Sequence, residues 1–331
     1  MITGATGFLG SHIVDELVRK NFDLTALVRK TSDISFLKSL KNVKFVNGDL
    51  LDCNSLKKAF RGCEVVIHNA SVVDEWGTYK YFYKNNVLGT QNVLDAVLDS
   101  SIKRIIYTSS ADIYKYSLDE IMENYQRKPR AMYHKSKIAA EDLLDSYAEN
   151  HGLNIIKIRP PGIIGPRNYY MAESVKRGIS KGQVTVIGTG EQVQSYVDPR
   201  DVATAIGLIL ENKNLVGETF NVKSFNASVK EYWKAAAKHL KKEITFTNYP
   251  YKIAYAFGAV SEFLAKITRR KTTPRATRFR VDYFGKQHMI DDTKISRTLK
   301  YKPKFDLKTS MGQMLDSLEI KEDNQILKKS H

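Results

Sequence analysis

The sequence predicts an α/β fold: a doubly wound parallel sheet joined to a smaller, mostly helical C-terminal substrate lobe. Three observations predict it. In the first half of the chain, short apolar runs alternate with amphipathic stretches of helical periodicity, which is the pattern of βαβ units. The chain opens with glycines spaced three apart in MITGATGFLG. The alternation weakens after residue 167, and the chain from residue 223 onward is helical in pattern and basic.

The expected strands and helices follow each other in order. We expect strands at 24–28, 43–46, 65–68, 104–108 and 154–158, and helices between them at 11–20, 55–60, 90–98 and 136–149. A further strand and helix are expected within 195–210, and another strand within 217–222. Parallel sheets of this kind are covered by helices on both faces.

The glycines of the opening segment predict a dinucleotide site. Gly4, Gly7 and Gly10 lead directly into the first helical pattern. Glycines at such a strand-to-helix turn let the backbone approach a pyrophosphate, which then rests on the helix N-terminus. The strand before this turn is reduced to Met1 and Ile2 although it would be central in the sheet, so we expect the natural chain to begin upstream of Met1.

The end of the second strand favours NADP(H) over NAD(H). A carboxylate about 20 residues beyond the glycines would bind the ribose 2′-hydroxyl of NAD, and this sequence has Arg29 there. An arginine suits a 2′-phosphate through bidentate charged hydrogen bonds. The alternative is that Arg29 and Lys30 are ordinary surface charges. Asp49, just after the third strand, is placed to meet the adenine.

Composition bounds the class of protein. The chain has 331 residues, 42% hydrophobic and 27% charged, as ordinary globular proteins have. Its longest apolar run, 253–267, is shorter than a membrane span and contains Glu262. With no secretory signal pattern at the start, we expect a cytoplasmic protein. Cys53 and Cys63 predict neither a disulfide framework nor a metal site.

Residues 110, 133 and 137 form a chemically coherent set. Ser110 follows the strand at 104–108, and Tyr133 and Lys137 are four positions apart in a helical pattern, so their side chains share one face. A nearby ammonium favours a phenolate, so we expect Lys137 to lower the pKa of Tyr133 toward useful proton transfer. The hydroxyl of Ser110 can hold a substrate oxygen beside the phenol.

The chain resembles the extended short-chain dehydrogenase/reductases, the superfamily that includes nucleotide-sugar epimerases and dehydratases. The resemblance rests on ordered matches over nearly the whole chain: TGATGFLG, GDL, HNAS, NNVLGTQNVLDA, TSSADIY, YHKSK, RPPGIIGP, YVDPRDVA and GETFNV. It implies a Rossmann domain of residues 1–165 and 193–222, and a substrate-binding lobe of residues 166–192 and 223–331.

The resemblance also implies roles for individual residues. Ser110, Tyr133 and Lys137 would be the catalytic triad, and Asn86 would be a further catalytic residue of the same site. The cofactor-binding residues would be Thr3, Gly4, Thr6, Gly7, Phe8, Leu9, Gly10, Arg29, Asp49, Leu50, Asn69, Ala70, Ser71, Tyr133, Lys137, Pro160, Gly162 and Ile163. A homodimer through a two-helix bundle is what the family would imply.

Two stretches point more narrowly within the superfamily. Residues 75–96 and 159–167 resemble the 3β-hydroxysteroid dehydrogenase and dihydroflavonol reductase group, which implies hydride exchange between a secondary alcohol and a ketone. The alternatives are a nucleotide-sugar 4-epimerase or dehydratase, and a non-catalytic NAD(P)-binding regulator. Nucleotide-sugar epimerases have an asparagine where this chain has Gly162, and regulators commonly lose the tyrosine or lysine that this chain keeps.

The C-terminal lobe is apolar, aromatic and basic in turn. Residues 230–304 contain 19 Lys and Arg against 6 Asp and Glu. We expect the apolar segment from Tyr249 to Phe263 to pack on the core, with solvated arginines after it. Two alternatives stay open, in which Arg269, Arg270, Lys271, Arg275 and Arg278 hold an anionic membrane surface or a phosphorylated substrate. No nucleic-acid-binding motif accompanies the charge. We expect His134 to face solvent, and Trp76 to pack or to border the substrate.

Overall fold

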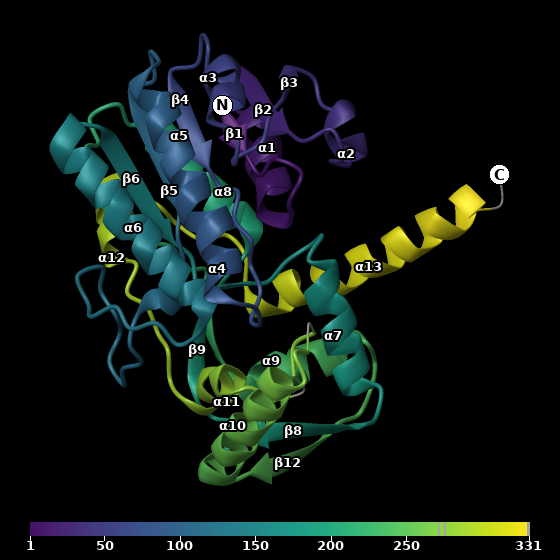
Figure 1. Cartoon of the computed structure of the whole chain (residues 1–331). Helices are drawn as coiled ribbons and strands as arrows, with labels where there is room; N and C mark the ends of the chain where they lie inside the picture. The colour runs from purple at the N-terminus through teal and green to yellow at the C-terminus, as the bar shows by residue number, and fades with distance from the viewer. Residues whose placement is uncertain (271, 275, 330–331) are drawn as a thin grey trace.

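The computed structural model describes residues 1–270, 272–274 and 276–329, with side chains to residue 321. Its centre is a parallel sheet of seven strands (Figure 1). In spatial order they are β10 (Thr219–Asn221), β6 (Asn154–Arg159), β5 (Arg104–Thr108), β4 (Val65–His68), β1 (Ile2–Thr3), β2 (Leu24–Val28) and β3 (Val43–Asn47). The order reverses between β1 and β4, which is where doubly wound sheets bind their ligands. The predicted fold class is confirmed.

Helices cover both faces of this sheet (Figure 1). One face carries α1 (Phe8–Arg19) and α8 (Pro199–Glu211), and the other carries α3 (Cys53–Ala59), α5 (Gly89–Leu98) and α6 (Met132–His151). Strand side chains alternate between the two cores, so Ile106 packs with the first pair and Ile105 with the second set. Full burial of each such side chain contributes about 1.5–3 kcal/mol.

The remaining elements connect or flank this sheet. Short helices α2 (Ser35–Lys38), α4 (Tyr79–Phe82), η1 (Tyr83–Leu88, a π-helix) and η2 (Ala111–Ile113) lie within its connections. Away from the sheet lie β7 (Gly162–Ile163), β8 (Gln183–Ile187), β9 (Val193–Val197), β11 (Phe225–Ser228), β12 (Thr245–Tyr249), α7 (Tyr169–Ile179), α9 (Val229–His239), α10 (Tyr251–Ile267), α11 (Arg278–Gly285) and α13 (Leu307–Lys329). The helix α12 (Thr293–Leu299) instead packs Ile295 and Leu299 into the core under the sheet.

Predicted and observed elements agree closely within the sheet. Each of the five strands predicted in the first half starts where we expected it, and two of them, β3 and β6, run one residue longer. The largest difference is α6, which begins at Met132 instead of residue 136. Tyr133 therefore lies in the first turn of a helix that ends at Gly152, whose φ of +66° suits a glycine.

The segment after β12 corrects one expectation. We expected its large apolar residues to pack on the core, but α10 buries Ala254, Gly258 and Ala265 and leaves its larger apolar side chains exposed. Gly258 explains this orientation, because a Cβ there would lie 3.0 Å from the backbone of Thr277 and Arg278. Small residues thus allow α10 to approach the start of α11. Two of the predicted basic residues, Lys271 and Arg275, lie outside the described residues.

A buried ion pair fixes α6 to the sheet. The guanidinium of Arg159 on β6 donates to Glu141 on α6 at 2.9 and 2.5 Å, and also donates to the hydroxyl of Tyr114 at 2.7 Å. The side chain of Glu141 is fully inaccessible to solvent. Burial alone would raise the pKa of Glu141, but the hydrogen bonds and charge of Arg159 outweigh burial and hold that pKa below its ordinary value.

We predict that Arg159→Met lowers the free energy of unfolding by about 3–5 kcal/mol, because it leaves a buried carboxylate without its partner. The matched control is Arg127→Met, which removes a 32% exposed partner of the same carboxylate and should cost less than about 1 kcal/mol. Urea denaturation measures both. Since the pKa of Glu141 is lowered by folding, the stabilisation is present above its unfolded pKa and disappears as the pH falls through the lowered pKa. Equal losses in the two variants would contradict the prediction.

Candidate active site

The turn between β1 and α1 is closed to side chains. Gly4 has a φ of +71°, and a Cβ on it would lie 2.8 Å from the backbone of Ala70. A Cβ on Gly10 would lie 1.9 Å from the carbonyl oxygen of Gly4. Gly7 caps α1, and no side chain among the described residues hydrogen-bonds the first N–H groups of that helix. The turn therefore leaves an uncapped helix N-terminus beside a bare backbone, which fits the pyrophosphate of a dinucleotide.

A buried hydrogen-bond chain leads from this turn into the sheet. The hydroxyl of Thr3 accepts the N–H of Ala70 at 3.1 Å and lies 2.9 Å from Nδ1 of His68. Nε2 of His68 lies 3.0 Å from the hydroxyl of Thr90, which donates to the carbonyl oxygen of Asn86 at 2.6 Å. Burial lowers the pKa of His68 to about 3, so its ring is neutral. The donors and acceptors then fit only if Nε2 carries the proton and the hydroxyl of Thr3 donates to Nδ1.

Asn86 continues this chain to α6. Its Oδ1 accepts the N–H of Val72 at 2.8 Å, and its Nδ2 donates to the carbonyl oxygen of Val72 and to Oγ of Ser136, each at 3.0 Å. Ser136 in turn donates to the carbonyl oxygen of Tyr133 at 2.6 Å. We predicted a catalytic role for Asn86, and these contacts fix its side chain between the backbone of Val72 and Ser136. It lies on the π-helix η1, an element often found at functional sites.

The structure brings two residues of the predicted triad, Ser110 and Lys137, to one strand end. Ser110 follows β5 and is buried, and its Oγ accepts the N–H of Asp112 at 3.1 Å. Lys137 is buried, and its Nζ donates to the carbonyl oxygen of Thr108, the last residue of β5, at 2.7 Å. Tyr133 lies one turn before Lys137, with its ring 6.3 Å from that of Phe82.

The electrostatics of this site differ from our expectation in direction. We predicted that Lys137 lowers the pKa of Tyr133. In the structure, burial raises the pKa of Tyr133, and the negative charge of Asp112 raises it further. Burial also lowers the pKa of Lys137 to about 7, although Glu141 opposes that change. The reason is desolvation: burial removes water from both groups, which disfavours both charged forms.

A cluster of polar side chains beside the triad carries unpaired atoms. Within the described part of the chain, five of its buried atoms have no hydrogen-bond partner: Oδ1 of Asp112, the hydroxyl of Tyr116, Nε of Arg130, Nδ1 of His134 and Nε2 of His288. Oδ1 of Asp112 lies 3.6 Å from Nη2 of Arg130, as an ion pair without a hydrogen bond. The guanidinium of Arg130 stacks 3.7 Å from the ring centroid of Tyr116, which is 5.4 Å from the ring of His288. The ring of Phe279 on α11 lies 4.8 Å from that of His134. We call Asp112, Tyr116, Arg130, His134 and His288 the polar cluster.

The polar cluster contains residues that the sequence left unassigned. We expected His134 to face solvent, but it is 2% exposed, and burial lowers its pKa to about 3. Asp112, Arg130 and His134 lie beside the triad in the motifs SSADIY and RAMYHKSK, so their positions offered a signal. His288 lies far from these motifs, and only the tertiary structure adds it.

The other predicted cofactor residues follow the carboxyl ends of strands of the sheet. Arg29 and Asp49 are exposed just after β2 and β3, and Leu50 is half-buried beside Asp49. The remaining ones follow β1, β4 or β6: Thr6, Phe8 and Leu9; Asn69 and Ser71; and Pro160 and Ile163. Gly162 is packed from above, because a Cβ there would lie 2.5 Å from the hydroxyl of Tyr283 on α11. Trp76 donates to the carbonyl oxygen of Arg270 at 3.0 Å.

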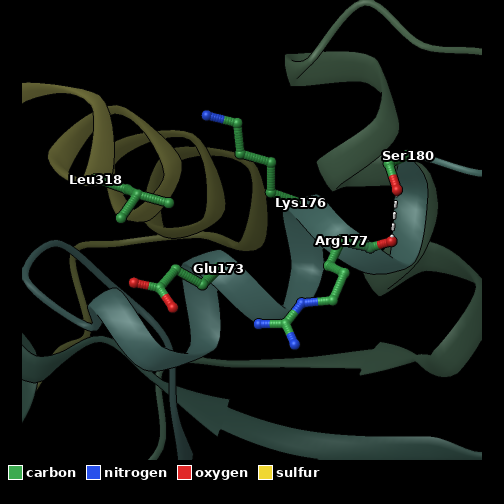
Figure 2. A pocket seen from close by; sticks show the side chains of 5 residues that line it. All are labelled: Glu173, Lys176, Arg177, Ser180 and Leu318. Atoms are coloured by element: carbon green, nitrogen blue, oxygen red, sulfur yellow. Dashed lines mark hydrogen bonds between the residues drawn. The ribbon is translucent and has the colours of Figure 1, made fainter. Parts of the chain in front are cut away.

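Two further observations bound the site. Figure 2 shows an open hollow on α7 and α13, lined by Glu173, Lys176, Arg177, Ser180 and Leu318, and no triad residue borders it. Its one drawn hydrogen bond is local, from Ser180 to the carbonyl oxygen of Arg177 at 2.8 Å. Within the described part of the chain, no group of three His, Cys, Asp or Glu side chains could hold a metal ion.

Comparisons with known proteins identify a family and several relatives of this chain. The model of the NAD dependent epimerase/dehydratase family matches residues 1–222. The decarboxylating sterol-4-alpha-carboxylate 3-dehydrogenase of Candida albicans is 29% identical over 342 residues, covering 96% of each chain. The N-acetyl-alpha-D-glucosaminyl-diphospho-ditrans,octacis-undecaprenol 4-epimerase of Escherichia coli O157:H7 is 27% identical over 299 residues, covering 89% of this chain and 88% of that one.

A solved structure agrees with these matches at the level of the fold. The crystal structure of gox2253 superposes with a TM-score of 0.82 at 24% identity, covering 97% of both chains. The glycine turn and the uncapped start of α1 fit the pyrophosphate of a nicotinamide dinucleotide. The chain therefore belongs to the NAD dependent epimerase/dehydratase family and is an NAD(P)-dependent oxidoreductase of the extended short-chain dehydrogenase/reductase type.

Proposed function

We propose that the chain interconverts a secondary alcohol and a ketone, with Tyr133 as the acid-base group. One observation carries the proposal: Lys137, in the first turns of α6, donates to the strand end that Ser110 follows, and Tyr133, one turn earlier, feels the charge of Asp112 two residues beyond Ser110. The bound dinucleotide would supply or accept the hydride. The sterol 3-dehydrogenase among the relatives acts, by its name, on a position of this kind.

Each residue of the triad has a hydrogen-bond donor available for this role. The oxygen of Ser110 already accepts the N–H of Asp112, so its own hydrogen can bind the substrate oxygen. Lys137 uses one of its three donors on Thr108, and the others can bind the nicotinamide ribose. Since burial raises the pKa of Tyr133, its phenol is protonated at neutral pH and can give a proton to a ketone oxygen.

An epimerase or dehydratase of a sugar nucleotide is the second candidate, because the family is one of epimerases and dehydratases and one relative is, by its name, a dTDP-D-glucose 4,6-dehydratase. It would take the same hydride and return it within one turnover. The packing of Tyr283 against Gly162 disfavours it, since that hydroxyl fills the space which the asparagine of nucleotide-sugar epimerases would need. Net change in the absorbance of reduced nicotinamide distinguishes the two, because only the dehydrogenase consumes its dinucleotide.

We also propose that the polar cluster binds a carboxylate next to the reacting carbon. Arg130 is its one permanent cation, and the two histidines are neutral because burial lowers the pKa of each to about 3. Nε of Arg130, the hydroxyl of Tyr116 and the ring N–H groups can all donate to a carboxylate. Burial raises the pKa of Asp112, which weakens its competition for Arg130. In the Candida relative the carboxylate named lies beside the oxidised position.

We predict that Tyr133→Phe lowers kcat about 10²- to 10⁴-fold while the Kd for the dinucleotide changes little, because the variant loses only the transferable proton. Tyr147→Phe is the matched control on the same helix, since the hydroxyl of Tyr147 binds Asp95. Stopped-flow absorbance and fluorescence titration give the two quantities. Normal turnover in Tyr133→Phe would remove the assignment.

We predict that Arg29→Gln weakens NADP binding about tenfold or more and leaves NAD binding nearly unchanged, because only the 2′-phosphate needs the guanidinium. Lys30→Gln serves as the neighbouring control. Titration calorimetry with both dinucleotides measures the ratio. A parallel loss for NAD and NADP, or tighter binding of NAD by the unaltered protein, would reverse the preference.

We predict that Arg130→Met removes selectivity for an acid over its ester. The probes are 2-hydroxycyclohexane-1-carboxylic acid and its methyl ester. Their binding to the dinucleotide-loaded protein is followed by saturation-transfer NMR. The unaltered protein and Arg127→Met should bind the acid about tenfold tighter than the ester, and Arg130→Met should bind both alike. If the unaltered protein does not distinguish acid from ester, the carboxylate site does not exist.

A further inference from the structure

The helix α10 has an apolar surface that faces outward. Its outer face consists of six large apolar side chains that are 55–63% exposed: Ile253, Phe257, Val260, Phe263, Leu264 and Ile267. Spacings of three and four residues place them on one side of the helix. The opposite side is buried through Ala254, Gly258 and Ala265. A water-exposed amphipathic helix has the reverse arrangement, with its large apolar side chains inward.

This outer face lies where a large partner can reach it. The helix is at the end of the molecule remote from β1, β2 and β3 (Figure 1). Contiguous exposed apolar side chains of this number mark an interaction surface rather than scattered surface residues. The described part of the chain contains no helix long and apolar enough to cross a membrane. Contact along the surface of a bilayer is therefore the geometry available to α10.

Basic side chains flank the outer face and indicate what covers it. Lys252, Lys266, Arg269 and Arg270 are all exposed. Among the described residues none of the four forms an ion pair with an acidic side chain, whereas Arg278 pairs with Glu262. Cations around an apolar stripe complement anionic lipid headgroups above an acyl layer. In a twofold dimer the same cations would face each other, which disfavours a second copy as the occupant.

We propose that the outer face of α10 docks on an anionic lipid surface, with the helix lying in the plane of the headgroups. The apolar side chains enter the boundary between headgroups and acyl chains, and the four basic residues bind lipid phosphates. The surface is independent of which substrate the enzyme takes, although it fits one with a lipid-soluble body.

The docked helix is connected to the catalytic site. Its Glu262 accepts from the backbone N–H of Arg278 at 2.7 Å and from its guanidinium, which attaches the start of α11 to α10. From α11, Phe279 reaches His134 and Tyr283 reaches Gly162. The carbonyl oxygen of Arg270 holds Trp76. Through α11, the docked surface is therefore linked to residues packed beside the proposed triad.

Vesicle flotation tests the docking without any substrate. The vesicles contain phosphatidylcholine with or without phosphatidylglycerol, at low and high KCl. The apolar variant is the pair Phe257→Gln and Phe263→Gln, and its matched control is Leu118→Gln with Val216→Gln, which are 82% and 68% exposed elsewhere. The charge variant is Lys266→Gln with Arg269→Gln. Dinucleotide binding and thermal melting confirm that each variant is folded.

We expect the unaltered protein and the control to bind vesicles containing phosphatidylglycerol. The apolar variant should bind them at least about tenfold more weakly. The charge variant should lose the preference for phosphatidylglycerol together with its salt dependence. Failure of the unaltered protein to float, or equal binding by the apolar variant, overturns the proposal. So does a dimer that the apolar variant converts to monomer on gel filtration, which would make a second copy the occupant. Turnover is not read, so the result stands apart from the proposed reaction.

Discussion

A buried hydrogen-bond chain couples the dinucleotide turn to the catalytic helix. It runs from Thr3 through His68 and Thr90 to Asn86, and Asn86 passes it to Ser136 at the start of α6. Each hydroxyl in it both donates and accepts, so the chain has a single consistent direction only while His68 is neutral. Because an unpaired buried polar group is costly, each member holds its neighbours in place. The glycine turn and Tyr133 are thereby kept in one fixed relation.

Burial at the start of α6 has two opposing consequences. The ion pair of Arg159 and Glu141 holds the helix against the sheet, which brings Lys137 to the end of β5. The same burial removes water from Lys137 and Tyr133. It lowers the pKa of Lys137 and raises the pKa of Tyr133, so the neutral form of each is favoured. A simple pairing of ammonium and phenol therefore does not describe the site. The phenol stays protonated, which suits it to give a proton to a developing alkoxide.

The molecule separates polar from apolar functions across α11. On its inner side, the polar cluster offers unpaired donors and an acceptor to a small region next to Ser110. On its outer side, α10 presents bulky apolar residues to the surroundings. The small residues of α10 make this possible, because Gly258 lets the two helices approach closely while the larger side chains point away. A substrate with one polar end and one lipid-soluble end would match this separation.

The sequence alone determined the strands of the sheet and named the residues of the proposed triad. Strand positions follow from local apolar runs, and TGATGFLG, TSSADIY and YHKSK contain the glycine turn and the proposed acid-base residues. These features are local, since a turn requires its glycines and a helix sets its own spacing of four residues.

Tertiary structure decided the rest, because each remaining property depends on residues distant in the chain. The side chain of Asn86 is held by Val72 and Ser136, and His134 is packed against Phe279. The direction of the pKa change at Tyr133 followed from burial, which one helix cannot specify. The outward orientation of α10 likewise depends on the close approach of the backbone at the start of α11 to Gly258. Periodicity shows that an apolar face exists but not which way it points.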